Sequence, residues 1–174
     1  MTSGVALPVE EAARRAKLIR LVITDCDGVL TDAGVYYSDA GEAMKRFSIR
    51  DGMGVERLRN AGIASAVMTG ERSRSVEHRA NKLSMRAYLG VKDKAAALVD
   101  VLGEHGIGAE AAAYIGDDVN DLPVMKRIGV AGLVGAPGDG MPVVRGAAHF
   151  ITQAHGGHGA FREFAEWILS LRVG

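Results

Sequence analysis

The stretch Leu18-Ile19-Arg20-Leu21-Val22-Ile23-Thr24-Asp25-Cys26-Asp27-Gly28 joins an apolar run to a pair of acidic residues. Residues 18–24 predict a buried β-strand, because the run is short, apolar and followed by a turn-forming sequence. Asp25 and Asp27 would then lie at the carboxyl end of this strand. Ligands of α/β proteins bind at that end of the sheet, so these two carboxylates are the first candidates for a functional site.

Helical and strand-like segments alternate along the rest of the chain. We predict helices over residues 9–17, 52–60, 73–83, 93–105, 120–128 and 159–171, and further strands over residues 63–68, 87–89, 112–115 and 130–134. Residues 34–47 hold two β-prone pieces around Asp39-Ala40-Gly41, which predicts a small hairpin. The alternation predicts an α/β fold, a parallel sheet covered by helices on both faces.

The composition predicts one domain spanning residues 1–174, since 174 residues with 48% hydrophobic side chains can fill a single core. The 21 Lys and Arg residues balance the 21 Asp and Glu residues. We therefore expect no nucleic-acid partner and no membrane partner. No apolar run is long enough to span a bilayer, and the only cysteine, Cys26, suits a reducing compartment, so we expect a cytoplasmic protein.

Four short segments follow predicted strands, and each carries a side chain suited to phosphoryl transfer. They contribute Asp25 with Asp27, Thr69 with Gly70, Lys94, and Asp117-Asp118 with Asp121. Any one of them alone is as simply explained as a helix cap or a turn former. Their coincidence at the ends of successive strands indicates one shared site.

This set of side chains predicts a magnesium-dependent reaction on a phosphate ester. A phosphate dianion repels a carboxylate nucleophile, so the site needs a cation between them. Oxygen ligands from Asp25, Asp117 and a backbone carbonyl suit Mg²⁺. The predicted metal site comprises Asp25, Asp27, Asp117, Asp118 and Asp121, with the last two mainly in its outer shell.

The same residues predict the roles in catalysis. Asp25 is the predicted nucleophile, which forms an aspartyl-phosphate intermediate. Asp27 is the predicted general acid and base. Thr69 and Lys94 are predicted to bind the phosphoryl group and to neutralise its charge, and Lys94 also to orient Asp25.

Other motif interpretations fit less well. An EF-hand loop starting at the first carboxylate would need Asp or Asn and then Gly where Val29 and Leu30 stand. Residues 52–54 lack the third glycine of a dinucleotide-binding loop, and no Walker sequence is present. His155 and His158 are a conceivable metal pair, but without a third ligand nearby we expect them in a solvated, flexible loop.

The motifs Asp25-x-Asp27-Gly28-Val29-Leu30-Thr31-Asp32, Thr69-Gly70, Lys94 and Gly116-Asp117-Asp118-x-x-Asp121 resemble the haloacid dehalogenase superfamily of phosphatases. More narrowly, the segments 49–54, 90–94, 114–118 and 156–163 resemble the 3-deoxy-manno-octulosonate 8-phosphate phosphatase family. The resemblance covers about residues 18–169. It implies a capless Rossmann-like domain and a homotetramer, in which the hairpin of residues 33–48 joins neighbouring copies and a neighbour closes the site.

The same resemblance suggests residues that select the substrate. Glu71, directly after Thr69-Gly70, and Lys82 match members that act on nine-carbon ketodeoxynononate or sialic acid 9-phosphates, whereas eight-carbon members carry other residues there. Glu71 would accept hydrogen bonds from sugar hydroxyls, and Lys82 would bind the substrate carboxylate across a subunit boundary. The alternative is a surface ion pair between the two. The other predicted substrate-binding residues are Arg50, Asp51, Gly52, Gly70 and Arg79.

Two alternatives to a phosphatase remain open at this point. Similar motifs occur in domains attached to sialic acid activating enzymes, so the chain could be a non-catalytic tetramerisation module that partners an acylneuraminate cytidylyltransferase. Retention of the acidic and lysine motifs argues against that. A phosphomutase would need a cap to keep water from the intermediate, and none is long enough. Many family members close the site with a C-terminal tail, which we do not expect here because the sequence ends at Gly174.

Overall fold

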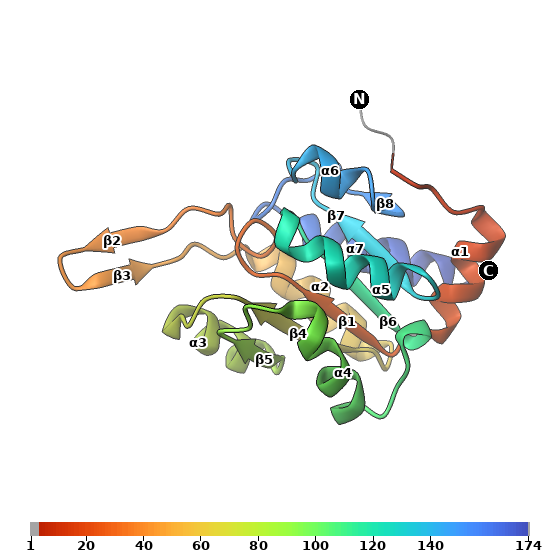
Figure 1. The fold of residues 1–174 in the computed structure, drawn as a ribbon, viewed down its shortest axis with the longest axis horizontal. Coiled ribbons are helices and arrows are strands. Elements are labelled where there is room, and N and C mark those ends of the chain that lie inside the picture. The colour runs from red at the N-terminus through yellow and green to blue at the C-terminus, as the bar shows by residue number, and fades with distance from the viewer. Residues whose placement is uncertain (1–3, 174) are drawn as a thin grey trace.

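The computed structural model describes residues 4–173 and is built around a six-stranded sheet (Figure 1). The strands lie in the order β5 (Arg86–Leu89), β4 (Ala64–Thr69), β1 (Leu21–Thr24), β6 (Ala112–Ile115), β7 (Leu133–Ala136) and β8 (Phe150–Ile151). Every neighbouring pair is parallel. The chain order therefore reverses at β1, which places a topological switch point beside the carboxyl end of this strand.

Helices cover both faces of the sheet, which confirms the predicted Rossmann-like α/β fold. One face packs against α1 (Val9–Leu18), α2 (Ile49–Asn60), α3 (Arg74–Leu83) and α7 (Ala160–Leu171). The other packs against α4 (Lys94–Glu104), α5 (Leu122–Gly129) and α6 (Pro142–Arg145). Side chains alternate between the two cores along each strand, so Val22 lies in the first core and Leu21 and Ile23 in the second. None of the helices between residues 4 and 173 is long and apolar enough to cross a membrane.

Several predicted boundaries were wrong. Residues 18–20 are not part of the first strand, because α1 continues to Leu18 and β1 begins at Leu21. The strand predicted over residues 130–134 is β7, which begins at Leu133, while Val130 is the exposed C-cap of α5. Neither α6 nor β8 was predicted, since each is too short to show a hydrophobic period.

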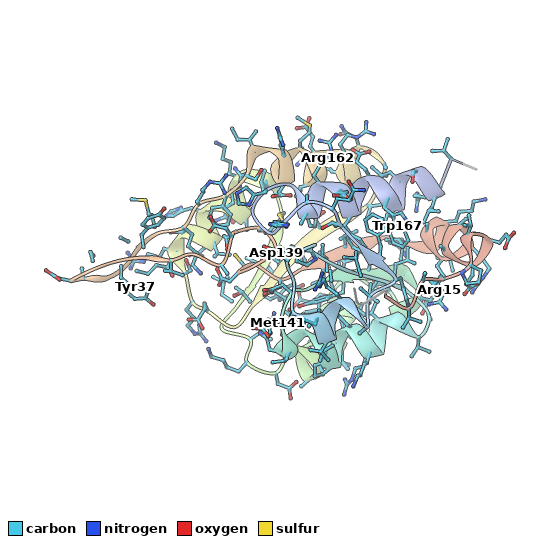
Figure 2. All side chains as sticks on the ribbon, turned by 90° about the horizontal axis from the view of Figure 1, so that it is seen from above. Arg15, Tyr37, Asp139, Met141, Arg162 and Trp167 are labelled. Carbon is cyan, nitrogen blue, oxygen red and sulfur yellow. The ribbon has the colours of Figure 1, made fainter. Side chains whose placement is uncertain are left out.

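The predicted hairpin is present as β2 (Tyr36–Ser38) and β3 (Gly41–Met44), joined at Asp39-Ala40. It projects away from the body of the molecule, with Tyr37 on the projecting arm (Figures 1 and 2). Tyr36, Tyr37 and Met44 are all more than half exposed. No second folded layer covers the sheet edge within residues 4–173, so this hairpin is what the chain has in place of a cap.

Candidate active site

A cleft of about 450 Å³ opens at the carboxyl ends of β1, β4 and β6. These three strands are direct neighbours in the sheet, so the segments that follow them converge. The cleft is lined by Asp25, Asp27, Ala33, Thr69, Gly70, Glu71, Asp117, Asp118, Val119 and Asn120. Most of the residues predicted for phosphoryl transfer thus face one space.

Lys94 lies beneath the floor of this cleft as a buried cation. It is the first residue of α4, and its side chain is only 1% exposed. Its Nζ donates one hydrogen bond to Asp25 Oδ1 and another to Asp121 Oδ1, both at 2.6 Å. The ammonium group therefore fixes one oxygen of Asp25 in place and offsets part of the negative charge around it.

Asp121 organises the loop that follows β6. Its Oδ1 accepts from Lys94 and from the Tyr114 hydroxyl at 2.6 Å, and its Oδ2 accepts from the backbone N–H groups of Asp117 and Asp118 at 2.9 and 3.2 Å. All four bonds end on a carboxylate that is fully buried. Asp121 thus holds Asp117 at the cleft, whereas Asp118 is exposed and accepts from the N–H of Val119.

The carboxylates of Asp25, Asp117 and Asp121 fit a divalent cation. Each offers an oxygen, and the three oxygens lie within 4.8 Å of one another. Burial and the surrounding negative charges raise the pKa values of Asp25 and Asp117. Asp117 Oδ1 is also buried without a hydrogen-bond partner among the described residues. Excess negative charge and an unpaired carboxylate oxygen are the features that a hard cation such as Mg²⁺ satisfies. Neither His155 nor His158 belongs to this cluster.

Asp27 points into the cleft from the same loop but has a different cation. Its Oδ1 accepts from Lys45 Nζ at 2.6 Å and from the Thr31 hydroxyl at 3.4 Å. Lys45 follows β3 of the hairpin, and its side chain is 1% exposed. The sequence analysis missed Lys45, because it lies in no strand-end segment and a single lysine in an exposed hairpin gives no signal of burial.

Thr69, the last residue of β4, lies across the cleft from these carboxylates. Its hydroxyl oxygen accepts from the N–H of Glu71 at 3.2 Å, which leaves the hydroxyl proton free to donate. Its side chain is almost fully buried at the cleft wall. This geometry suits a donor to an oxygen of a bound anion.

Close backbone approach explains the glycines around the nucleophile loop. Gly28 has φ +94°, and a Cβ there would lie 2.0 Å from Asp117 Oδ2. A Cβ on Gly156 would lie 2.0 Å from the carbonyl oxygen of Gly28, and the N–H of Gly157 donates to Val29 O at 2.9 Å. The flexible loop predicted around residues 155–158 was therefore wrong for the two glycines, which are buried, although His155 and His158 are exposed.

The predicted substrate-binding residues do not all meet at this cleft. Gly70 and Glu71 line it, and Glu71 pairs with Lys92 at 3.2 Å rather than with Lys82. Lys82 is exposed on α3, and Arg50 is exposed outside the cleft. Any contact of Lys82 or Arg50 with substrate stays a prediction.

Three of these residues have structural contacts instead. Asp51 caps α7, because its Oδ1 accepts from the N–H of Arg162 at 3.0 Å, and burial raises its pKa to about 6. Arg79 donates to Ser48 O at 2.9 Å, and Gly52 is buried against the Arg79 guanidinium. The predicted roles of Asp51, Gly52 and Arg79 in binding therefore lack a place in this protomer's own cleft.

Comparison with known proteins identifies the site. A scan against models of protein families finds no match. The chain is 39% identical over 161 residues to the 3-deoxy-D-manno-octulosonate 8-phosphate phosphatase of Yersinia pestis, across 92% of this chain and 84% of that protein. The chain belongs to the 3-deoxy-D-manno-octulosonate 8-phosphate phosphatase family. It is a phosphoric monoester hydrolase of the haloacid dehalogenase type.

Solved structures of this phosphatase family share its fold and bear on the metal. A phosphatase of Moraxella catarrhalis in complex with magnesium ion, phosphate ion and KDO superposes with a TM-score of 0.87 at 36% identity, over 94% of this chain and 93% of that one. A cobalt-bound phosphatase of Haemophilus influenzae superposes with a TM-score of 0.87 at 39% identity, over 91% and 92% of the two chains. Together with the Asp25, Asp117 and Asp121 cluster, these relatives identify the chain as a Mg²⁺-dependent phosphatase.

Proposed function

We propose that this phosphatase hydrolyses the phosphate ester of a 3-deoxy-2-ulosonic acid, with 3-deoxy-D-manno-octulosonate 8-phosphate as the first candidate. The observation that carries the proposal is the buried Asp25–Lys94–Asp121 array below a cleft that also holds Asp27 and Thr69. The relatives named above supply the substrate class.

The residues of this chain divide the reaction into two steps. Lys94 holds one oxygen of Asp25, and the other oxygen attacks phosphorus while the bond to the sugar oxygen breaks. Asp27 gives its proton to the leaving alkoxide. It then takes a proton from the water that cleaves the aspartyl-phosphate and releases phosphate. Mg²⁺ held by Asp25 and Asp117 would screen the charge of the phosphoryl group.

A nine-carbon acid 9-phosphate is the second candidate, because Glu71 lines the cleft. A carboxylate at the mouth of the site accepts hydrogen bonds from the hydroxyls of a longer chain. The comparison to make is kcat/KM on the eight-carbon and the nine-carbon substrates. A preference of tenfold or more for either, about 1.4 kcal/mol of transition-state discrimination, decides between them.

The nucleophile is tested by Asp25→Asn, which keeps the shape of the side chain but cannot attack phosphorus. We expect it to abolish Mg²⁺-dependent phosphate release. Asp100→Asn on the exposed face of α4 is the matched control and should retain activity. Phosphate release at the wild-type rate by the Asp25 variant would refute the assignment.

We also propose that the protein assembles as a homotetramer through the hairpin and works in the cytoplasm. Tyr36, Tyr37 and Met44 expose apolar surface on an arm that packs on nothing else in the described chain, which supports an interface. Mass photometry tests the assembly, and a monomer at micromolar concentration would contradict it. A purely structural tetramerisation module is not favoured, since it would not need the buried lysine and its carboxylates.

A further inference from the structure

Lys45 is a buried cation delivered to the active site by an otherwise exposed hairpin. Residues 33–44 are exposed or half-exposed, whereas the side chain of Lys45 is 1% exposed. Its Nζ lies 2.6 Å from Asp27 Oδ1 and 3.8 Å from Glu42 Oε2. Removing an ammonium group from water is unfavourable unless it is paired, so its place against Asp27 is specific.

The segment that carries Lys45 is fixed on both sides. Before it, the Glu42 carboxylate accepts from the hydroxyl of Ser73, the N-cap of α3. After it, Arg46 Nη1 donates to Gly157 O at 3.1 Å. The base of the hairpin is therefore tied to two parts of the cleft wall, which leaves Lys45 little freedom to move away from Asp27.

Direct binding of the phosphoryl group by Lys45 is the competing interpretation. Lys45 does not line the cleft, and its Nζ is already engaged by two carboxylates. Lys94 also provides a buried cation beside Asp25. The contacts thus connect Lys45 to the carboxyl group of Asp27 rather than to the phosphate.

We propose that Lys45 is a positioning residue, which together with Thr31 holds the carboxyl group of Asp27 where it meets the leaving oxygen. This inference rests on the proposed function, in which Asp27 is the general acid. It also gives the hairpin a role within its own subunit, separate from any role in assembly.

The leaving group provides the test, because only a poor leaving group needs the proton. A sugar alkoxide must be protonated as it leaves, whereas p-nitrophenolate leaves as a stable anion. Lys45→Met should lower kcat/KM on the sugar-acid phosphate by at least about tenfold, a fraction of the roughly 10²–10⁴-fold that general acid catalysis contributes. On p-nitrophenyl phosphate, kcat/KM should change by less than about threefold.

Three variants serve as controls. Asp27→Asn should show the same leaving-group selectivity, and adding Lys45→Met to it should cause little further loss, since both changes act on one step. Lys126→Met replaces an exposed lysine on α5 and should change neither substrate. If Lys45→Met does not fold, as judged by circular dichroism, Lys45→Gln keeps a polar group at the buried position and allows the same comparison.

Each outcome gives a decision. Equal losses on the two substrates would mean that Lys45 acts on the phosphoryl group or on the fold, and would overturn the inference. Unchanged kinetics on both would also overturn it. Failure of the wild type to hydrolyse either substrate would instead refute the proposed function.

Discussion

Replacing Lys94 by methionine should destabilise the metal-free protein strongly. Lys94 is the only cation that contacts Asp25 or Asp121 among the described residues, at 2.6 Å from each. Methionine fills similar space but leaves two buried carboxylates without a counter-charge. Breaking a buried ion pair by removing one partner costs about 3–5 kcal/mol. For a chain of this length each kcal/mol lowers the melting temperature by roughly 2–4 °C, so we expect a loss of roughly 6–20 °C.

Magnesium should recover part of this loss, because the cation binds the same carboxylates. Thermal unfolding followed by circular dichroism, in EDTA and in saturating Mg²⁺, measures the effect. The gain in melting temperature on adding Mg²⁺ should be larger for Lys94→Met than for the wild type. Lys126→Met, the exposed control, should stay within about 0.5 kcal/mol of the wild type in both conditions. A Lys94→Met protein as stable as the wild type in EDTA would refute the electrostatic account of the cluster.

Two further predictions concern the carboxylates. Asp51→Ala should lower the free energy of unfolding by about 1–2 kcal/mol through loss of the α7 cap, while Asp51→Asn loses less because an amide oxygen still accepts; urea unfolding measures both, and a tenfold fall of kcat/KM in a stable Asp51→Asn would show instead that Asp51 binds substrate. In EDTA, stability should fall as the pH rises from about 4 toward neutral, because the raised pKa values of Asp25, Asp117 and Asp51 make the folded state bind more protons than the unfolded state. Saturating Mg²⁺ should flatten this slope by keeping the metal-site carboxylates ionised, and an unchanged slope would contradict the assignment of the metal site.

The strand-end residues could be predicted from sequence because the physics there is local. An apolar run places Asp25 at the end of β1, and the same holds for Thr69 and β4. Parallel neighbours end at one edge of the sheet, so order along the chain was enough to bring these side chains together. The hairpin followed from an equally local turn signal.

Contacts between distant segments could not be predicted in this way. Lys45 and Asp27 are 18 residues apart, and nothing in the hairpin sequence distinguishes the buried lysine from exposed Arg46. Asp51 seemed to be a binding residue because its motif resembles the family, yet its carboxylate meets the N-terminus of α7, 111 residues later. Such pairings depend on how helices pack, which hydrophobic period alone does not fix.

The buried glycines at 156 and 157 also constrain the order in which this enzyme becomes competent during synthesis. They contact Gly28 and Val29, so the nucleophile loop, made early in translation, meets its backing only after about nine-tenths of the 174 residues have been added. Contacts of such long sequence separation form slowly. Nascent chains that lack this segment should therefore carry all four strand-end motifs on a loop that is not yet held in its final shape.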